Sequence, residues 1–298
     1  MRRQEIEFVD GLHVRLALPA EPLRPYITAY YTTHIESETP ISDWLYPEWG
    51  NVRMIYEGGF DCYRVGVEPY RAEFPLIQGP TTKPIHVSTG HVRVVGIGLL
   101  PSAFSHMFGV DVDHYADAYV PVADLLGSGG DDLAKALAAI DGDDDAQFAL
   151  CDAFFLNLIA GKPERPRTVL VQALHKLLND PDINTVQEIG DALGLGAARL
   201  NRLCKQGFGF SPKLLLRRQR FLRMLGALHS RPYTEWRDFA DPSYVDQSHL
   251  IREFKYFMGL SPSQYLALPR PIQLAAVPKR AEVIGRPLQG LHKMGEKD

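Results

Sequence analysis

Two short stretches of the sequence, fifty positions apart, carry side chains that suit contact with the edges of base pairs. Asparagine, glutamine and arginine have paired polar groups that match base edges in the major groove, small residues allow close approach, and isoleucine can meet a thymine methyl group. Either stretch taken alone is more simply explained as solvated helix surface. The candidates for base contact are Ala198, Asn201 and Arg202 in the first stretch and Gln247, Ser248, Ile251 and Arg252 in the second.

Both stretches belong to a repeated unit. Residues 200–212 and 250–262 share six identities in 13 aligned positions, whereas unrelated segments of that length share roughly one. Duplication is the simplest explanation, and it favours a common role for the two exposed surfaces, because solvation does not require the same selection of side chains twice. The identical positions are Leu200, Arg202, Lys205, Gly209, Ser211 and Pro212, which recur as Leu250, Arg252, Lys255, Gly259, Ser261 and Pro262.

Helix-end signals predict that the repeated unit is a helix, a tight turn and a second helix. In the first copy Thr185 and Glu188 have the spacing of a capping box, and Gly194 ends the helix that follows. The second helix is expected over residues 197–206. In the second copy Asp246 is expected to cap the corresponding helix.

A long basic helix is predicted over residues 212–228, between the two copies. Arg217 and Arg218 lie on it, and arginines that face DNA contact phosphates. The same residues are equally compatible with the plain solvent surface of a connecting helix. Both interpretations stay open at this point.

Charge is segregated along the chain. Residues 1–165 contain 12 Lys and Arg against 24 Asp and Glu, whereas residues 166–270 contain 15 against 9. A basic module attached to an acidic one indicates that only the basic part approaches a polyanion. The sequence start lacks the apolar core of a signal peptide, and the most apolar stretch, residues 94–100, is too short to span a membrane. A cytoplasmic protein without membrane contact is therefore expected.

The residue pattern predicts two domains. Residues 1–160 combine β-branched and aromatic segments with helical stripes from Asp131 onward, which indicates an α+β domain, a small β-barrel or sandwich with helices, for sensing or dimerisation. Residues 161–167 are typical of a linker. Residues 168–268 are predicted to form an all-α double helix-turn-helix domain, and the proline-rich residues 269–298 a poorly ordered tail.

The C-terminal segment resembles the DNA-binding domain of AraC-type transcription regulators, in which a long helix joins two helix-turn-helix units. Residues 243–254, Ser-Tyr-Val-Asp-Gln-Ser-His-Leu-Ile-Arg-Glu-Phe, carry the resemblance together with Gly-Leu-Ser-Pro at 259–262. It implies that the seven candidates named above contact bases. It also implies phosphate contacts for His249 and Lys255, and we assign the same role to Lys205.

A weaker resemblance concerns the N-terminal part. Residues 79–84 and 95–101 resemble a poorly characterised domain that precedes this module in some AraC-type regulators. That resemblance implies no particular ligand.

The second unit departs from the AraC-type pattern. Ser243 stands where the family has a turn glycine, and residues 236–243 are one position short and contain Pro242. Because proline ends or distorts a helix, the second recognition helix is expected to sit differently or to bind more weakly.

No cofactor or metal is expected. Residues 141–145, Asp-Gly-Asp-Asp-Asp, lack the ligand alternation of a calcium-binding EF-hand loop, and an acidic cap for the next helix is favoured instead. Four histidines are candidate metal ligands, but their spacing is not that of a ligand set. They are His86, His91, His106 and His114.

The remaining candidates are cysteines and aromatic residues. The scattered thiols of Cys62, Cys151 and Cys204 are expected to be buried and reduced. The aromatic residues of the acidic domain either line a small-molecule pocket or, as is favoured, fill the core. These are Trp44, Tyr46, Trp49, Tyr56 and Tyr63.

Together these patterns predict a sequence-specific DNA-binding transcription regulator and not an enzyme, since no nucleophile elbow, phosphate loop or dinucleotide fingerprint occurs. Its two recognition helices would enter successive major-groove segments about 34 Å apart. Double-stranded DNA is the expected partner. A small-molecule effector with unassigned binding residues, RNA polymerase and a second copy of the chain are further candidates. The alternative is a ligand-binding or enzymatic N-terminal module whose helical part is a protein-interaction scaffold.

Overall fold

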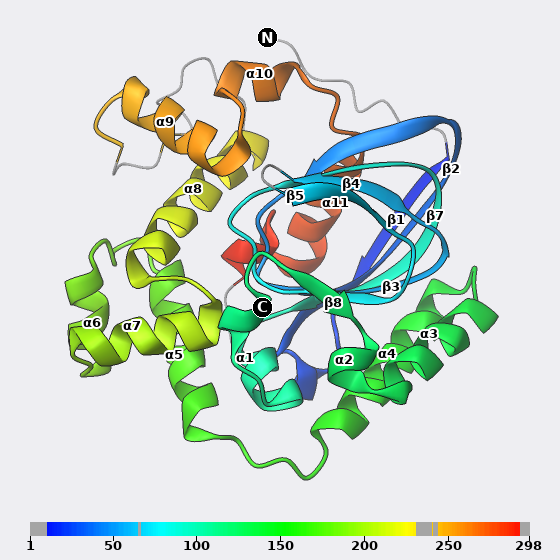
Figure 1. The fold of residues 1–298 in the computed structure, drawn as a ribbon, viewed down its shortest axis with the longest axis horizontal. Helices are drawn as coiled ribbons and strands as arrows, with labels where there is room; N and C mark the ends of the chain where they lie inside the picture. The colour runs from blue at the N-terminus through cyan, green and yellow to red at the C-terminus, as the bar shows by residue number, and fades with distance from the viewer. Residues whose placement is uncertain (1–10, 65–66, 231–239, 241–243, 293–298) are drawn as a thin grey trace.

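The computed structural model describes residues 11–64, 67–230, 240 and 244–292. Among these residues, those between 12 and 121 contain a curled antiparallel sheet with the strand order β1-β2-β7-β3-β6-β8, and the β4–β5 hairpin is attached to β7 (Figure 1). The longest strands, β2 and β7, pair along most of their length, with a register shift between Glu36 and Ile41. The strands are β1 Leu12–Ala17, β2 Ile27–Leu45, β3 Asn51–Gly58, β4 Phe60–Arg64, β5 Val67–Ala72, β6 Leu76–Gln78, β7 Ile85–Leu99 and β8 Tyr119–Pro121.

Side chains alternate between the two faces of the sheet, as the period of a strand requires. On β7, Val95 and Ile97 pack toward helices α3 and α4, whereas Val92 and Val94 pack on the opposite, concave face. The concave face is covered by α11, from the C-terminal end of the chain (Figure 1). The helices of this domain are α1 Pro101–Ala103, α2 Ala123–Leu126, α3 Ser128–Ala139 and α4 Asp144–Ile159. This arrangement confirms the predicted α+β domain.

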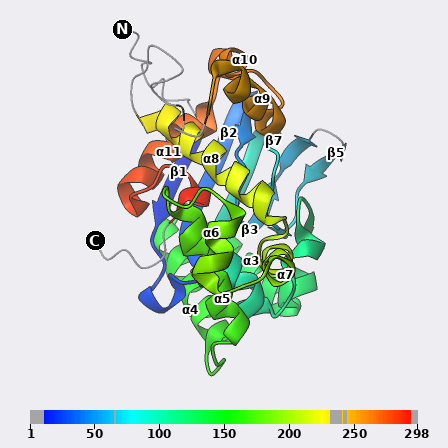
Figure 2. The same ribbon diagram turned by 90° about the vertical axis from the view of Figure 1, so that its left-hand side faces the viewer.

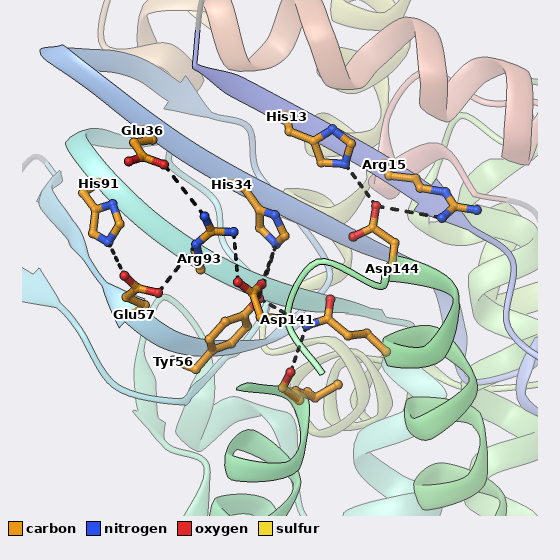
Figure 3. Close-up of polar contacts among 12 residues, drawn as sticks. His13, Arg15, His34, Glu36, Tyr56, Glu57, His91, Arg93, Asp141 and Asp144 are labelled. Carbon is orange, nitrogen blue, oxygen red and sulfur yellow. Dashed lines mark hydrogen bonds and ion pairs between the residues drawn. The ribbon is translucent and has the colours of Figure 1, made fainter. Parts of the chain in front are cut away.

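The acidic segment at the start of α4 caps that helix and forms ion pairs with the outer face of the sheet. Asp143 caps α4 by accepting a hydrogen bond from the backbone N–H three residues on, at 3.0 Å, which confirms the predicted cap. Its neighbours reach the strands: Asp141 lies 3.0 Å from Arg93, and Asp144 lies 3.0 Å from His13 (Figure 3). The carboxylates are therefore engaged by basic side chains of the sheet.

The four candidate histidines do not converge on a common site. His91 pairs with Glu57 at 2.8 Å, and His106 is buried against an aromatic ring, while His86 and His114 have other neighbours. Among the described residues, no group of three side chains is placed to hold a metal ion.

The thiols and aromatic rings mostly fill the core. All three cysteines are buried and unpaired, as expected, and burial raises the pKa of Cys151 and of Cys204 to about 12. Of the five aromatic residues, Tyr46 lines a cavity on the concave face. Trp49 is fully buried in the core, and Tyr63 is exposed.

The second half of the described chain is helical. Exposed residues without regular structure separate α4 from α5, where a linker was expected. The following helices do not form an isolated core, because Trp49 and Leu100 of the first domain pack with α5 to α8, and Tyr46 packs with α8 to α10. The helices are α5 Pro166–Asn179, α6 Val186–Leu193, α7 Ala197–Phe208, α8 Pro212–Ser230, α9 Gln247–Met258 and α10 Pro262–Ala267.

The prediction of a poorly ordered tail is wrong for most of this segment. Residues 271–284 form α11, with Ile272 buried against the sheet and Val277 buried in the cluster that joins Tyr46 to α8, α9 and α10. Further on, the Gln289 side chain accepts a hydrogen bond from the Trp49 N–H at 2.9 Å and donates to a neighbouring carbonyl at 2.7 Å. The tail is ordered because its apolar and amide groups have partners in the sheet domain. These partners lie far away in the sequence, so no local pattern predicts the contacts.

Candidate nucleic-acid interface

The first helix-turn-helix unit is built by local capping. The Thr185 hydroxyl accepts from the Glu188 N–H at 3.2 Å, and the Glu188 carboxylate accepts from the Thr185 N–H at 3.0 Å. Gly194 then ends α6 in the left-handed conformation, with φ at 64°. Both features were predicted from the sequence and both are confirmed, so α7 starts after a tight turn.

Helix α7 has one buried and one exposed face. Leu200, Leu203 and Cys204 pack in the core of the unit. The opposite face is exposed to solvent, as the helical period predicts. It carries Ala198, Asn201, Arg202 and Lys205, which are the four residues assigned to DNA contact in this unit.

Helix α9 of the second unit repeats this arrangement. Asp246 caps it by accepting from the His249 N–H at 2.6 Å, and Leu250 and Phe254 are buried on its inner face. Its exposed face carries Gln247, Ser248, Arg252 and Lys255. Ile251 and His249, in contrast, are half-buried. They are therefore less accessible to DNA than the sequence suggested.

The expected disturbance of the supporting helix by Pro242 and Ser243 lies outside the described residues.

The two recognition helices end in the same way. The N–H of Gly209 donates to the Lys205 carbonyl at 2.8 Å, and the N–H of Gly259 donates to the Lys255 carbonyl at 2.9 Å. Both glycines are left-handed, with φ at 82° and 74°. The duplication seen in the sequence is therefore a duplication of geometry.

The surroundings of the two glycines differ, which gives a matched test. A Cβ on Gly209 would lie 2.6 Å from Cβ of Ala116, whereas a Cβ on Gly259 would meet nothing within 4 Å. We expect Gly259→Ala to lower the free energy of unfolding by about 1 kcal/mol through backbone strain alone, and Gly209→Ala to lower it by about 1–3 kcal/mol more through the clash. Urea denaturation of the two variants measures the difference. Equal losses would show that α7 is not packed on the first domain.

The two units lie at opposite ends of α8 (Figures 1 and 2). Helices α6 and α7 pack near the start of α8, and α9 and α10 near its end. A groove lies between the units and is lined by basic side chains of α8, among them Lys213 and Arg220. The groove and the exposed faces of α7 and α9 together form the candidate interface.

Arg217 and Arg218, assigned to phosphates in the sequence analysis, are used inside the protein. Arg217 donates two hydrogen bonds to the Glu253 carboxylate of α9, at 2.7 and 3.2 Å, and stacks over Tyr256. The hydrogen bonds to Glu253 raise the pKa of Arg217. They also use the Nε and Nη2 groups with which Arg217 would bind a phosphate.

The assignment of Arg218 as a phosphate contact is wrong. Its side chain is fully buried, lies 4.0 Å above the Trp49 ring and donates to the Thr81 carbonyl at 3.0 Å. Burial lowers the pKa of Arg218 to about 9. Phosphate cannot reach a group that is enclosed between α8 and the first domain.

Basic residues of the interface that the sequence analysis did not assign are Arg199, exposed on α7, and Lys213, exposed on α8. Arg199 is one position ahead of the buried Leu200, and Arg202 and Gln206 follow it on the same side at helical spacing. This spacing could have identified Arg199 in the sequence as part of the same exposed face.

Residues 189–267, from within α6 to the end of α10, match a family described as a helix-turn-helix domain. These residues form an AraC-type helix-turn-helix domain. The resemblance stated from residues 243–254 is thereby confirmed, and the chain is a DNA-binding transcription regulator. Residues 15–121 match a separate family, the domain of unknown function DUF6597. The sheet domain and the AraC-type domain therefore belong to different families.

Solved structures give more distant likenesses. An apo variant of ToxT from Vibrio cholerae strain SCE256 aligns with a TM-score of 0.45 and 11% identity, over 80% of this chain and 96% of that one. Wild-type ToxT from the same strain, bound to an unsaturated fatty acid, aligns with a TM-score of 0.43 and 10% identity, over 89% and 97%. The AraC-like transcriptional activator CuxR aligns with a TM-score of 0.29 and 14% identity, over 71% and 86%.

The sequence matches none of the curated proteins. Among the helices that the structure describes, none combines the length and the apolar character needed to cross a bilayer.

Proposed function

We propose that the AraC-type domain reads a specific, asymmetric DNA sequence by placing α7 and α9 in successive major-groove segments. The observation that carries this proposal is the repeated geometry: two helices with the same glycine end expose the same kinds of amide and guanidinium groups at the two ends of α8. Asn201, Arg202, Gln247 and Arg252 would discriminate between bases, and Lys205 and Lys255 would contact phosphates.

The relative position of the two helices supports a single chain reading both segments. The first unit is tied to the sheet domain through Asp111, which accepts from Gln206 of α7 at 2.8 Å and pairs with Arg167 of α5. The second unit is tied to it through Tyr46, whose hydroxyl contacts both His229 and Tyr265. Because both units are held on the same sheet domain, a fixed spacing between half-sites is expected.

Arg202→Ala tests direct readout. Binding-site selection from random duplexes, followed by anisotropy titrations of the full chain, is expected to show lost preference at one base-pair position, at a cost of about 1–3 kcal/mol for the preferred base. Lys176→Ala, an exposed cation on α5, is the matched control and should leave the preference unchanged.

Other outcomes assign Arg202 differently. A uniform loss of affinity for all duplexes with a shallower salt dependence would make Arg202 a phosphate contact. Equal, weak affinity of the wild type for every duplex at moderate salt would contradict sequence-specific binding and favour a protein-interaction scaffold.

We also propose that a small-molecule effector binds on the concave face of the sheet. A cavity of about 120 Å³ lies there, with walls from the sheet and from α11. Its position between the sheet domain and the helix that follows the second unit supports a role in control. A ligand that binds the folded state raises its thermal midpoint, so thermal-shift measurements detect occupation.

A further inference from the structure

The cavity between the sheet and α11 has a largely apolar wall. Ile55 and Val87 line it from the strands, and Val277 lines it from α11. A volume of about 120 Å³ corresponds to roughly ten non-hydrogen atoms, since one water-sized position takes ~10–15 Å³. The cavity therefore suits a small, mostly apolar molecule.

One corner of the cavity is polar and almost completely paired. Arg53 donates to Glu48 at 2.7 Å and to Gln78 at 2.9 Å. Asn51 donates to the same Glu48 oxygen at 2.6 Å and accepts from the Tyr31 hydroxyl at 3.2 Å. One oxygen of the Glu48 carboxylate, Oε2, thus accepts from both Arg53 and Asn51.

Arg280 of α11 adds a second guanidinium to this wall. The charged residues that line the cavity are Glu48, Arg53 and Arg280, so two cations face one anion. Nη1 of Arg280 is buried and has no hydrogen-bond partner among the described residues. A buried guanidinium N–H without a hydrogen bond is costly, and burial lowers the pKa of Arg280 despite the nearby Glu48. The corner has an excess of one positive charge.

We propose that the cavity binds a small apolar molecule with a single carboxylate, held by Arg280, as a refinement that rests on the proposed effector site. A carboxylate matches the guanidinium fork with two charge-assisted hydrogen bonds. One negative charge balances the excess, which favours a monocarboxylate over a doubly charged phosphate. A neutral ligand leaves the positive charge of this corner in excess, and a cation is repelled.

Helix α11, which carries Arg280, is not part of either domain that the family matches define. It lies outside both family matches, which end at residues 121 and 267. It follows α10 after three residues, and its N-terminal Gln273 N–H donates to Asp43 of the sheet at 2.8 Å. A ligand on Arg280 therefore joins the sheet to the helix that continues from the second helix-turn-helix unit.

Calorimetric titration of the full-length wild type with three matched probes tests the proposal. The probes are 3-phenylpropionate, 3-phenylpropan-1-ol and 3-phenylpropylamine, which share one apolar body and differ in charge. The acid is expected to bind at least about tenfold more tightly than the alcohol or the amine, because charge-assisted hydrogen bonds to a buried group exceed the energy of a tenfold change.

Variants assign the preference to Arg280. Arg280→Gln is expected to lower the affinity for the acid at least about tenfold and to leave that for the alcohol unchanged. Lys279→Gln removes the same charge from an exposed neighbour and should bind as the wild type does. Ala276→Phe fills the cavity without a change of charge and should weaken the acid and the alcohol alike. Circular dichroism of each variant verifies folding.

Three results would overturn the proposal: no binding of the acid at millimolar concentration, equal affinities for acid and alcohol, or full acid affinity in Arg280→Gln. Should Arg280→Gln fail to fold, two measurements still test the proposal. These are the ratio of the wild-type affinities for acid and alcohol, and the effect of Ala276→Phe on both affinities. None of these results alters base selection by α7, which the Arg202→Ala titrations measure separately. Failure of the ligand class is therefore distinguishable from failure of the DNA-binding proposal.

Discussion

Replacing Arg218 with alanine is expected to lower the free energy of unfolding by about 3 kcal/mol. The substitution removes the hydrogen bond to the Thr81 carbonyl, leaves that carbonyl unpaired, and opens a gap beside the Trp49 ring. Each of these changes falls at the contact between α8 and the sheet domain, where the side chain is fully buried. Urea denaturation of the full chain measures the loss.

The alternative role for Arg218 predicts the opposite pattern. A phosphate contact on α8 would leave the stability within about 0.5 kcal/mol of the wild type and would weaken DNA binding at low salt. Arg202→Ala provides the control, because Arg202 is exposed on α7 and its removal should not affect unfolding. Unchanged stability of Arg218→Ala would contradict the structural role assigned to it.

Stability is also expected to fall as the pH drops from 7 to 5, owing to buried histidines. Burial lowers the pKa of His175 to about 3, with smaller contributions from His292 and Arg218, and it lowers the pKa of His229 to about 4. Below pH 6.5 the unfolded chain takes up a proton that the folded chain does not, so the folded state is disfavoured. For His175 the loss is about 2 kcal/mol at pH 5.

A carboxyl group acts in the opposite direction over part of this range. Burial raises the pKa of Asp43 to about 6, so the folded chain binds this proton before the unfolded chain does. Between pH 6 and pH 4 protonation of Asp43 therefore favours folding, by about 1 kcal/mol at pH 5. The two histidines outweigh this effect.

His175→Gln isolates the main contribution. Urea denaturation at pH 7 and at pH 5 is expected to show that this variant loses about 2 kcal/mol less than the wild type on acidification. His114→Gln, at an exposed position, should keep the wild-type loss. A full pH dependence in His175→Gln would show that His175 is protonated in the folded state.

Local rules were sufficient for the individual elements of the DNA-binding domain. The capping box at Thr185 and the left-handed Gly194, Gly209 and Gly259 are set by hydrogen bonds between residues a few positions apart. The exposed faces of α7 and α9 follow from the helical period, which is equally local. This is why the candidate base contacts could be chosen from the sequence, and why most of them lie on exposed surface.

What the sequence by itself determined is thus the helical type and the approximate ends of α6, α7, α8 and α9, and the duplicated face of α7 and α9. Only the tertiary structure decided that Arg218 is buried against Trp49, that α11 covers the concave face of the sheet, and that Arg280 meets Glu48 and Arg53 in one cavity. These contacts join residues more than a hundred positions apart. An arginine on a helix has the same local pattern whether it faces water or a second domain, because only packing, and not the helical period, decides what covers it.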